Sequence, residues 1–349
     1  MHKVMTMLRW IRNSGLCLTL ALLLTGCAGP RMGQSFRDLR YPVATQLLDV
    51  EGVQVAYSDS GGAQDAPALL LIHGLGSYLP AWSQNLAALA QHHRVVAIDL
   101  PGFGRSSKGN YNYSMEFFAR VVDGVIERLK LARVVMVGHS MGGQIALTHA
   151  LLFPGKAQAL ALCAPAGLEV FDGPEGTWLA EATGKDTIKA TPPEGIYVNL
   201  AGNFYDMPKA ARFMAEDRVK IIGGPDFDGY AYAVSRSVAA MLDGPVVERL
   251  PQIQLPVLGV YGKDDGLIPN PFLHGGSTRA VAEKGVARLP RGRLVLVPRA
   301  GHFVMFEQAA RVNQEILGFV AALPVAAQPV SAPAVSAPAV SAPPAGATP

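Results

Sequence analysis

The sequence predicts an α/β fold: a mostly parallel sheet covered by helices on both faces, with a helical segment inserted before the last two strands. Three observations indicate this class. Short apolar runs of strand length alternate with helical stretches, which is typical of a parallel sheet buried on both sides. The alternation stops in residues 167–250, a segment that is interrupted repeatedly by Gly and Pro. It then resumes with two more apolar runs and a final helical stretch.

The strands and helices are expected in a simple order. Two short β-like stretches around Glu51-Gly52, within residues 43–57, predict a hairpin. Strands are expected at the apolar runs 69–72, 95–98, 134–137, 159–163, 257–261 and 294–297. Helices are expected at 82–89, 114–129, 141–152 and 306–320, the second beginning at Ser114, a good N-cap residue.

The N-terminal segment has a pattern that is typical of a targeting signal. Lys3, Arg9 and Arg12 precede a short apolar run, which ends in Leu24-Thr25-Gly26-Cys27. This order resembles a bacterial lipoprotein signal, and the resemblance implies that residues 1–26 are removed and that Cys27 is lipidated. The protein would then be anchored in the bacterial cell envelope, and the neutral residue after the cysteine favours the outer membrane. An uncleaved signal anchor and cleavage by the general signal peptidase remain alternatives.

Charge and cysteine content exclude several classes. The formal net charge of +3 comes from 30 basic and 27 acidic residues, and three of the basic residues lie in the signal. The remaining chain is near neutral, which gives no support for a nucleic-acid partner. Cys163 is the one cysteine between the signal region and the C-terminus, so no intrachain disulfide is expected. It lies in an apolar run and is expected to pack in the core.

The chain divides into five expected segments. Residues 1–26 form the signal, 27–42 a linker, 43–166 with 251–323 the core, and 167–250 a helical cap. Residues 324–349 consist of Pro, Ala, Val and Ser with few other types, and Val-Ser-Ala-Pro-Ala recurs there. Such a tail lacks charge and large side chains, so it is expected to be disordered.

The pattern Gly138-His139-Ser140-Met141-Gly142 points to chemistry most directly. It follows an apolar run and opens a helical stretch, which is the context required for a nucleophilic serine on a strand-to-helix turn. The two glycines avoid collisions across so sharp a turn, and the helix start directs N–H groups toward the site. Ser140 is therefore the candidate nucleophile.

A serine nucleophile needs a base, and the base needs an acid that orients it. His302 follows the run 294–297, and Asp264 and Asp265 follow the run 257–261. Loops at the carboxyl ends of parallel strands meet at one edge of the sheet, where α/β proteins place their ligands. The order serine, aspartate, histidine fits this arrangement, and both carboxylates remain candidates for the acid.

These motifs and their order resemble the α/β-hydrolase family, of the capped lipase and esterase kind, over residues 43–323. The resemblance implies that the acid is the third residue after Gly262, which selects Asp265 and leaves Asp264 as a turn or capping residue. It also implies a serine hydrolase that cleaves carboxylic esters through an acyl-enzyme.

The loop His73-Gly74-Leu75-Gly76 is similar to the oxyanion loop of that family. The resemblance implies that the N–H groups of Leu75 and Met141 stabilise the negative oxygen of the tetrahedral intermediate. His73 is expected to order this loop rather than to act in catalysis. Asp99 and Arg105 belong to another family-like turn and are expected to be structural.

The predicted cap is rich in large apolar residues, a few of which are expected to line a pocket for an apolar acyl or alcohol group. They are Phe204, Met207, Phe213, Met214, Ile221, Ile222, Phe227, Tyr230, Tyr232 and Met241. The expected partners are a small-molecule ester or lipid and a membrane. No cofactor or metal is expected, because no metal-ligand spacing, dinucleotide fingerprint or phosphate loop is found. Two alternatives remain: a hydrolase of carbon–carbon bonds with the same fold, and a non-catalytic envelope lipoprotein that binds ligands.

Overall fold

The fold is known from a computed structural model that describes residues 33–62, 66–273 and 275–324. The predicted signal, Cys27 and the Pro/Ala-rich tail beyond residue 324 lie outside the described residues. Within those that are described, no helix is both long and apolar enough to cross a bilayer.

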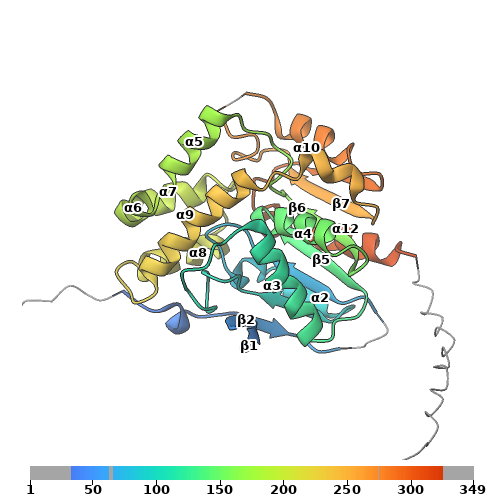
Figure 1. The fold of residues 1–349 in the computed structure, drawn as a ribbon, viewed down its shortest axis with the longest axis horizontal. Coiled ribbons are helices and arrows are strands. Elements are labelled where there is room, and N and C mark those ends of the chain that lie inside the picture. The colour runs from blue at the N-terminus through green and yellow to red at the C-terminus, as the bar shows by residue number, and fades with distance from the viewer. Residues whose placement is uncertain (1–32, 63–65, 274, 325–349) are drawn as a thin grey trace, which may run out of the picture.

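A single sheet forms the centre of the molecule (Figure 1). Its strands lie in the order β1-β2-β4-β3-β5-β6-β7-β8. Strands β1, β2 and β4 pair in antiparallel fashion, and all the other pairs are parallel. The strands are β1 Gln46–Val50, β2 Val53–Asp59, β3 Leu69–Ile72, β4 Val95–Ile98, β5 Val134–His139, β6 Ala157–Cys163, β7 Val257–Gly262 and β8 Gly292–Val297.

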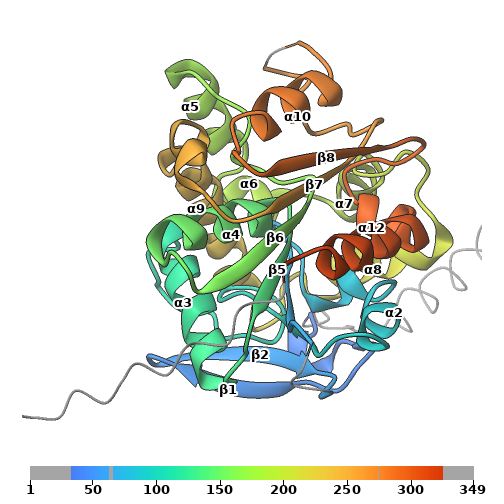
Figure 2. The same ribbon diagram turned by 90° about the vertical axis from the view of Figure 1, so that its right-hand side faces the viewer.

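Helices cover both faces of the sheet, and Figure 2 shows the two layers. Helices α3 Met115–Arg128 and α4 Met141–Leu152 lie on one face, and α2 Leu86–Ala90 and α12 Ala309–Ala321 lie on the other. Alternate residues of one strand serve the two faces: Leu70 joins the cluster that contains α3, whereas Leu69 and Leu71 join the cluster that contains α12. The mostly parallel sheet with helices on both faces is therefore confirmed.

A helical cap lies between β6 and β7 and covers one end of the sheet (Figure 1). Its helices are α5 Gly173–Ala182, α6 Lys185–Ala190, α7 Pro193–Ala201, α8 Arg212–Lys220 and α9 Phe227–Asp243, with the 3-10 turns η3 Lys209–Ala211 and η4 Val247–Gln252. The predicted helical insertion before the last two strands is thus confirmed.

The predicted elements differ from the observed ones mainly at helix ends. The stretch expected as one helix at 82–89 is a 3-10 turn, η2 Leu79–Trp82, followed by α2. The final helix is broken into α11 Val304–Glu307 and α12. Helix α10 Thr278–Val286, between β7 and β8, has no counterpart among the predicted elements.

Residues 33–42, predicted to be part of a linker, pack against the folded domain. They include the 3-10 turn η1 Phe36–Asp38, and both Phe36 and Leu39 are buried. The N–H of Gln34 donates to the carbonyl of Lys220, and the N–H of Phe36 donates to the carboxylate of Asp226. Both acceptors belong to the cap, so we call residues 33–39 the N-terminal strap.

Candidate active site

Ser140 occupies a strained turn between β5 and α4. Its backbone has φ 52° and ψ −119°, a region that non-glycine residues seldom adopt. The turn is possible because neighbouring positions lack side chains. A Cβ on Gly138 would lie 2.5 Å from the carbonyl oxygen of Gly142, and a Cβ on Gly142 would collide with the carbonyl oxygen of Ile72. The sequence therefore places the serine at the carboxyl end of β5, beside the first turn of a helix.

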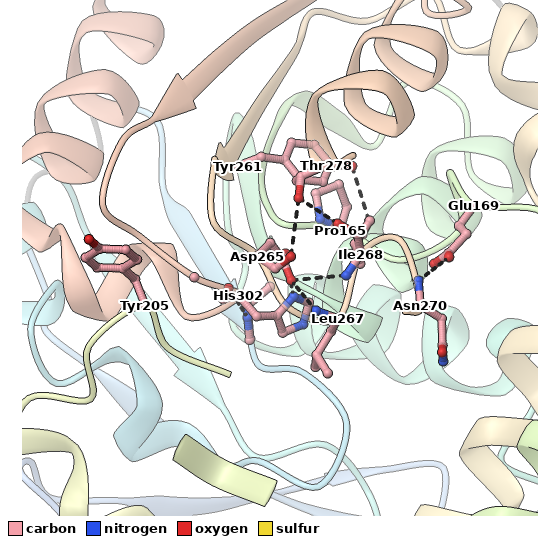
Figure 3. Close-up of polar contacts among 12 residues, drawn as sticks. Pro165, Glu169, Tyr205, Tyr261, Asp265, Leu267, Ile268, Asn270, Thr278 and His302 are labelled. Atoms are coloured by element: carbon pink, nitrogen blue, oxygen red, sulfur yellow. Dashed lines mark hydrogen bonds and ion pairs between the residues drawn. The ribbon is translucent and has the colours of Figure 1, made fainter. Parts of the chain in front are cut away.

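His302 and Asp265 form a buried pair (Figure 3). Nδ1 of His302 lies 2.9 Å from Oδ2 of Asp265, and the two residues are 4% and 8% exposed. The other oxygen of Asp265 accepts the N–H groups of Leu267 at 2.8 Å and Ile268 at 3.1 Å. The carboxylate is thus held by its own loop and can keep the N–H on Nδ1 of His302, which leaves Nε2 as the basic nitrogen.

Contacts through His139 connect the serine turn to the histidine loop. Nε2 of His139 lies 3.1 Å from the carbonyl oxygen of His302, and the two imidazole rings are 5.0 Å apart. Burial lowers the pKa of His139 well below its usual value, with the neighbouring His302 as a smaller cause. His139 is therefore neutral, and its Nε2–H donates to the carbonyl of His302. The residue before the candidate nucleophile thus holds the backbone of the candidate base in place.

The predicted oxyanion loop lies directly against Ser140. A Cβ on Gly74 would be 3.0 Å from the Cβ of Ser140, so only a glycine allows this approach. Among the described residues, the N–H of Leu75 donates to no acceptor. Met141 is the first residue of α4, and its N–H has no partner within the helix. Both predicted donors are thus free to bind an oxygen at this point.

His73 has a structural position, as predicted. Its Nδ1 donates to the carbonyl of Gly74 at 2.8 Å, and its Nε2 accepts the N–H of Leu100 at 2.9 Å. Burial lowers the pKa of His73 to about 4, so the ring is neutral near pH 7. The ring therefore joins the predicted oxyanion loop to the turn after β4.

Asp99, Arg105 and Cys163, which were predicted to be structural, have positions in keeping with that role. Asp99 is buried and accepts the N–H groups of Leu79 and Arg105. The guanidinium of Arg105 donates to the carbonyl of Leu39 in the N-terminal strap. Cys163 is a free, buried cysteine, and burial raises the pKa of its thiol to about 12.

A narrow cavity lies between the cap and the loops of the site. It has about 330 Å³ of unfilled space, part of it open to solvent. Its walls combine the predicted oxyanion loop and the two residues after it, the residue after His302, the strap and the cap. They are formed by Phe36, Gly76, Ser77, Tyr78, Leu200, Met214, Asp217, Arg218, Ile221, Tyr230 and Phe303.

Three of the apolar cap residues predicted as pocket candidates line this cavity: Met214, Ile221 and Tyr230. Others have different surroundings; Tyr232, for example, packs against Tyr113. Arg218 and Phe36 were not among the predicted pocket residues. Arg218 is one of several cations in its helical stretch, and Phe36 lies outside the predicted domain, so neither is distinguished by a pattern in the sequence. In the part of the chain that is described, no three His, Cys, Asp or Glu side chains are grouped as metal ligands.

The fold and the site together define a hydrolase of the α/β type. Residues 67–309 match the family described as alpha/beta hydrolase fold, so the chain belongs to this family.

Three similar proteins illustrate its range. The chain is 32% identical over 281 residues to the dihydrolipoyllysine-residue acetyltransferase component of the acetoin cleaving system of Pseudomonas putida, covering 79% of this chain and 69% of that one. A probable hydrolytic enzyme from Pseudomonas aeruginosa has a TM-score of 0.68 at 27% identity, covering 81% of this chain and 95% of the other. A membrane phospholipase A, described as a bacterial virulence factor, has a TM-score of 0.67 at 25% identity, covering 90% and 98%.

Further relatives and solved structures carry the names of esterases, lipases, meta-cleavage hydrolases and haloperoxidases. The family therefore leaves the bond that is cleaved to be inferred from the site.

Proposed function

We propose that this protein is a serine hydrolase that cleaves carboxylic esters with apolar acyl groups. The observation that carries the proposal is the buried His302–Asp265 pair, which follows β8 and β7 at the same sheet edge as the strained turn of Ser140. A buried carboxylate on Nδ1 orients a histidine as a general base for a serine nucleophile.

The reaction follows from the roles of these groups. Nε2 of His302 takes the proton of Ser140 as Oγ attacks the ester carbonyl, and Asp265 stabilises the imidazolium that forms. The N–H groups of Leu75 and Met141 hold the negative oxygen of the tetrahedral intermediate. Collapse of the intermediate breaks the bond to the alcohol, which leaves with the proton from His302. Water, deprotonated by His302, then attacks the acyl-enzyme and releases the acid from Ser140.

Part of the cavity wall favours an apolar substrate. Leu200, Met214, Ile221 and Phe303 contribute side chains without charge or hydrogen-bonding groups. The similarity to a membrane phospholipase A over 90% of the chain also favours a lipid ester.

The proposal is tested with p-nitrophenyl esters of increasing acyl length, using residues 28–349 and the same chain carrying Ser140→Ala. Release of p-nitrophenol that the substitution abolishes is expected, together with labelling of Ser140 by a fluorophosphonate. A folded wild-type protein that neither turns over any ester nor reacts with the label would refute the proposal. It would leave a non-catalytic envelope lipoprotein as the better interpretation.

A second candidate activity is hydrolysis of a carbon–carbon bond. It is favoured by 28% identity over 283 residues to the 2-hydroxy-6-oxononadienedioate/2-hydroxy-6-oxononatrienedioate hydrolase of Burkholderia vietnamiensis. The same three side chains would serve both reactions. This activity would be favoured over ester hydrolysis by two results together. Ser140 would be labelled although no ester is turned over, and a vinylogous diketone would lose its colour.

We also propose that Cys27 is lipidated and that the protein is anchored in the bacterial outer membrane. The support is the order of basic residues, apolar run, small residues and cysteine at the N-terminus. Cells fed a labelled fatty acid should label the wild type, whereas Cys27→Ala should remain unlabelled. A labelled Cys27→Ala variant would exclude this anchor.

A further inference from the structure

The carbonyl group of Gly76, at the end of the oxyanion loop, is held by two donors from the cap. Nη2 of Arg218, on α8, donates to it at 2.8 Å, and the hydroxyl of Tyr230, on α9, donates at 3.0 Å. Gly76 has φ +63°, and a Cβ there would lie 3.2 Å from that hydroxyl. Glycine thus permits both the backbone conformation and the approach of the cap.

Within the loop, a second carbonyl is also held. The carbonyl of Gly74 accepts the N–H of Ser77 at 3.2 Å and Nδ1–H of His73 at 2.8 Å. In a trans peptide group the C=O and the following N–H point in opposite directions. Fixing the carbonyl of Gly74 therefore fixes the direction of the N–H of Leu75, the proposed oxyanion donor.

These bonds connect into one chain through two peptide groups. Arg218 and Tyr230 donate to the carbonyl of Gly76, whose peptide group carries the N–H of Ser77. That N–H donates to the carbonyl of Gly74, whose peptide group carries the N–H of Leu75. Hydrogen bonds in such a series polarise one another, by about 10–30% per bond. The charge of Arg218 at the far end thus strengthens the N–H of Leu75 as a donor.

The two cap donors are themselves held in place. The ring of Tyr230 packs at 5.5 Å from the ring of Phe36 in the strap and nearly perpendicular to Phe103 at 6.1 Å. Nη1 of Arg218 donates to the side chain of Asn199 at 3.4 Å. Their hydrogen-bonding groups are therefore aimed at Gly76 by the surrounding packing.

We propose that Arg218 and Tyr230 are positioning residues, which orient and polarise the N–H of Leu75 so that it stabilises the oxyanion. This inference rests on the proposed function, because it assigns the two side chains a part in the same reaction. It predicts that the cap contributes to the rate of the chemical step as well as to the substrate pocket. Their loss should weaken binding of the transition state more than binding of the ester.

The test compares matched pairs of variants. Tyr230→Phe removes one hydroxyl and keeps the ring, and its control is Tyr232→Phe, two residues further along α9, where the ring packs on Tyr113. Arg218→Met removes the charge, and its control is Arg212→Met at the exposed start of α8. Arg218→Lys keeps the charge and is the conservative variant. For each protein we would measure kcat, KM, Tm and inhibition by a trifluoromethyl ketone, which forms an oxyanion on Ser140.

Tyr230→Phe is expected to lower kcat about three- to tenfold and Arg218→Met about tenfold or more, with Arg218→Lys in between. KM should change by less than about twofold, and the inhibition constant of the ketone should rise by the same factor as kcat/KM falls. The two controls should keep wild-type kinetics.

The inference is overturned if Ser140-dependent turnover is normal in both test variants. It is also overturned if kcat falls while ketone inhibition is unchanged, because the effect would then not act on the oxyanion. Failure of the proposed function gives a different result: the wild type itself would show neither Ser140-dependent turnover nor labelling, and Arg218 and Tyr230 would have no oxyanion to serve.

Discussion

Asp264 and Asp265 are neighbours in the chain, but their carboxylates lie in different environments. Asp264 is exposed and accepts the N–H of Arg299 at 3.0 Å, which makes it a turn residue. Asp265 is buried and accepts from His302 and from two N–H groups of its own loop. By resemblance, the position three residues after Gly262 selected Asp265 as the acid. The structure shows which groups each of the two carboxylates contacts.

Asp265→Asn is therefore expected to lower kcat by about 10³- to 10⁴-fold with little change in fold. An amide in this position can present an N–H to His302 and favour the wrong tautomer. Steady-state kinetics on the best p-nitrophenyl ester would measure the effect. Asp264→Asn is the matched control and should retain most of the activity; equal losses in the two variants would contradict the assignment.

His73 gives the protein a pH-dependent stability. Its pKa is about 4 in the folded protein, because of burial, against 6.5 for an unburied histidine. Between pH 6.5 and 4 the unfolded chain binds a proton that the folded chain does not, so stability falls as the pH falls through this window. The full loss from this one group is about 3 kcal/mol, and His139, shifted in the same direction, adds to it.

Urea unfolding at a series of pH values would test this. His73→Gln should be less stable than the wild type near pH 7 and should show a shallower loss of stability between pH 6.5 and 4, by about one proton. The exposed His92→Gln should retain the wild-type slope. An unchanged slope in His73→Gln would show that this ring is not the group responsible.

At the scale of elements, the strands were the most predictable part. All the apolar runs expected as strands are strands, because buried parallel strands require continuous apolar sequence. Helix α3 begins where predicted, since the side chain of Ser114 accepts the N–H of Phe117. The turn of Ser140 was predictable because only the two glycines permit its geometry.

What could not be predicted depends on contacts between distant parts of the chain. The strap has no periodic pattern, and its burial comes from Phe36 and Leu39 meeting the cap and the turn after β4. The two donors on Gly76 lie more than a hundred residues away from it, on helices whose sequences give no sign of that contact. Pairings of this kind arise only in the folded molecule.

The glycines of the serine turn give a test at this scale. Gly142→Ala should destabilise the protein by about 3 kcal/mol or more, because the new methyl group would collide with the carbonyl oxygen of Ile72. Gly318→Ala, in the exposed part of α12 where no atom lies within 4 Å of the new Cβ, should instead stabilise it by about 0.5–1 kcal/mol. Urea unfolding measures both, and similar effects of the two substitutions would contradict this difference.

For the whole molecule, the strap joins the start of the chain to the cap. A chain that begins at residue 43 lacks Phe36 and Leu39, each of which contributes about 1.5–3 kcal/mol by burial. We expect a clearly lower Tm than for a chain that begins at residue 33. Thermal unfolding of the two chains would measure this, and equal Tm values would show that the strap adds no stability.

For a lipid-anchored protein, the strap would also limit the orientation of the domain at the membrane. Five residues lie between Cys27 and Gly33, and a fully extended chain over these six Cα-to-Cα steps reaches about 20 Å. Gly33 lies against the backbone of Ile222 and Gly224, between α8 and α9. If Cys27 carries the lipid, this short connection would keep the junction of α8 and α9 close to the bilayer surface. The rest of the domain could still rotate about that junction. A lipid leaving that bilayer would then have only a short path to the cap.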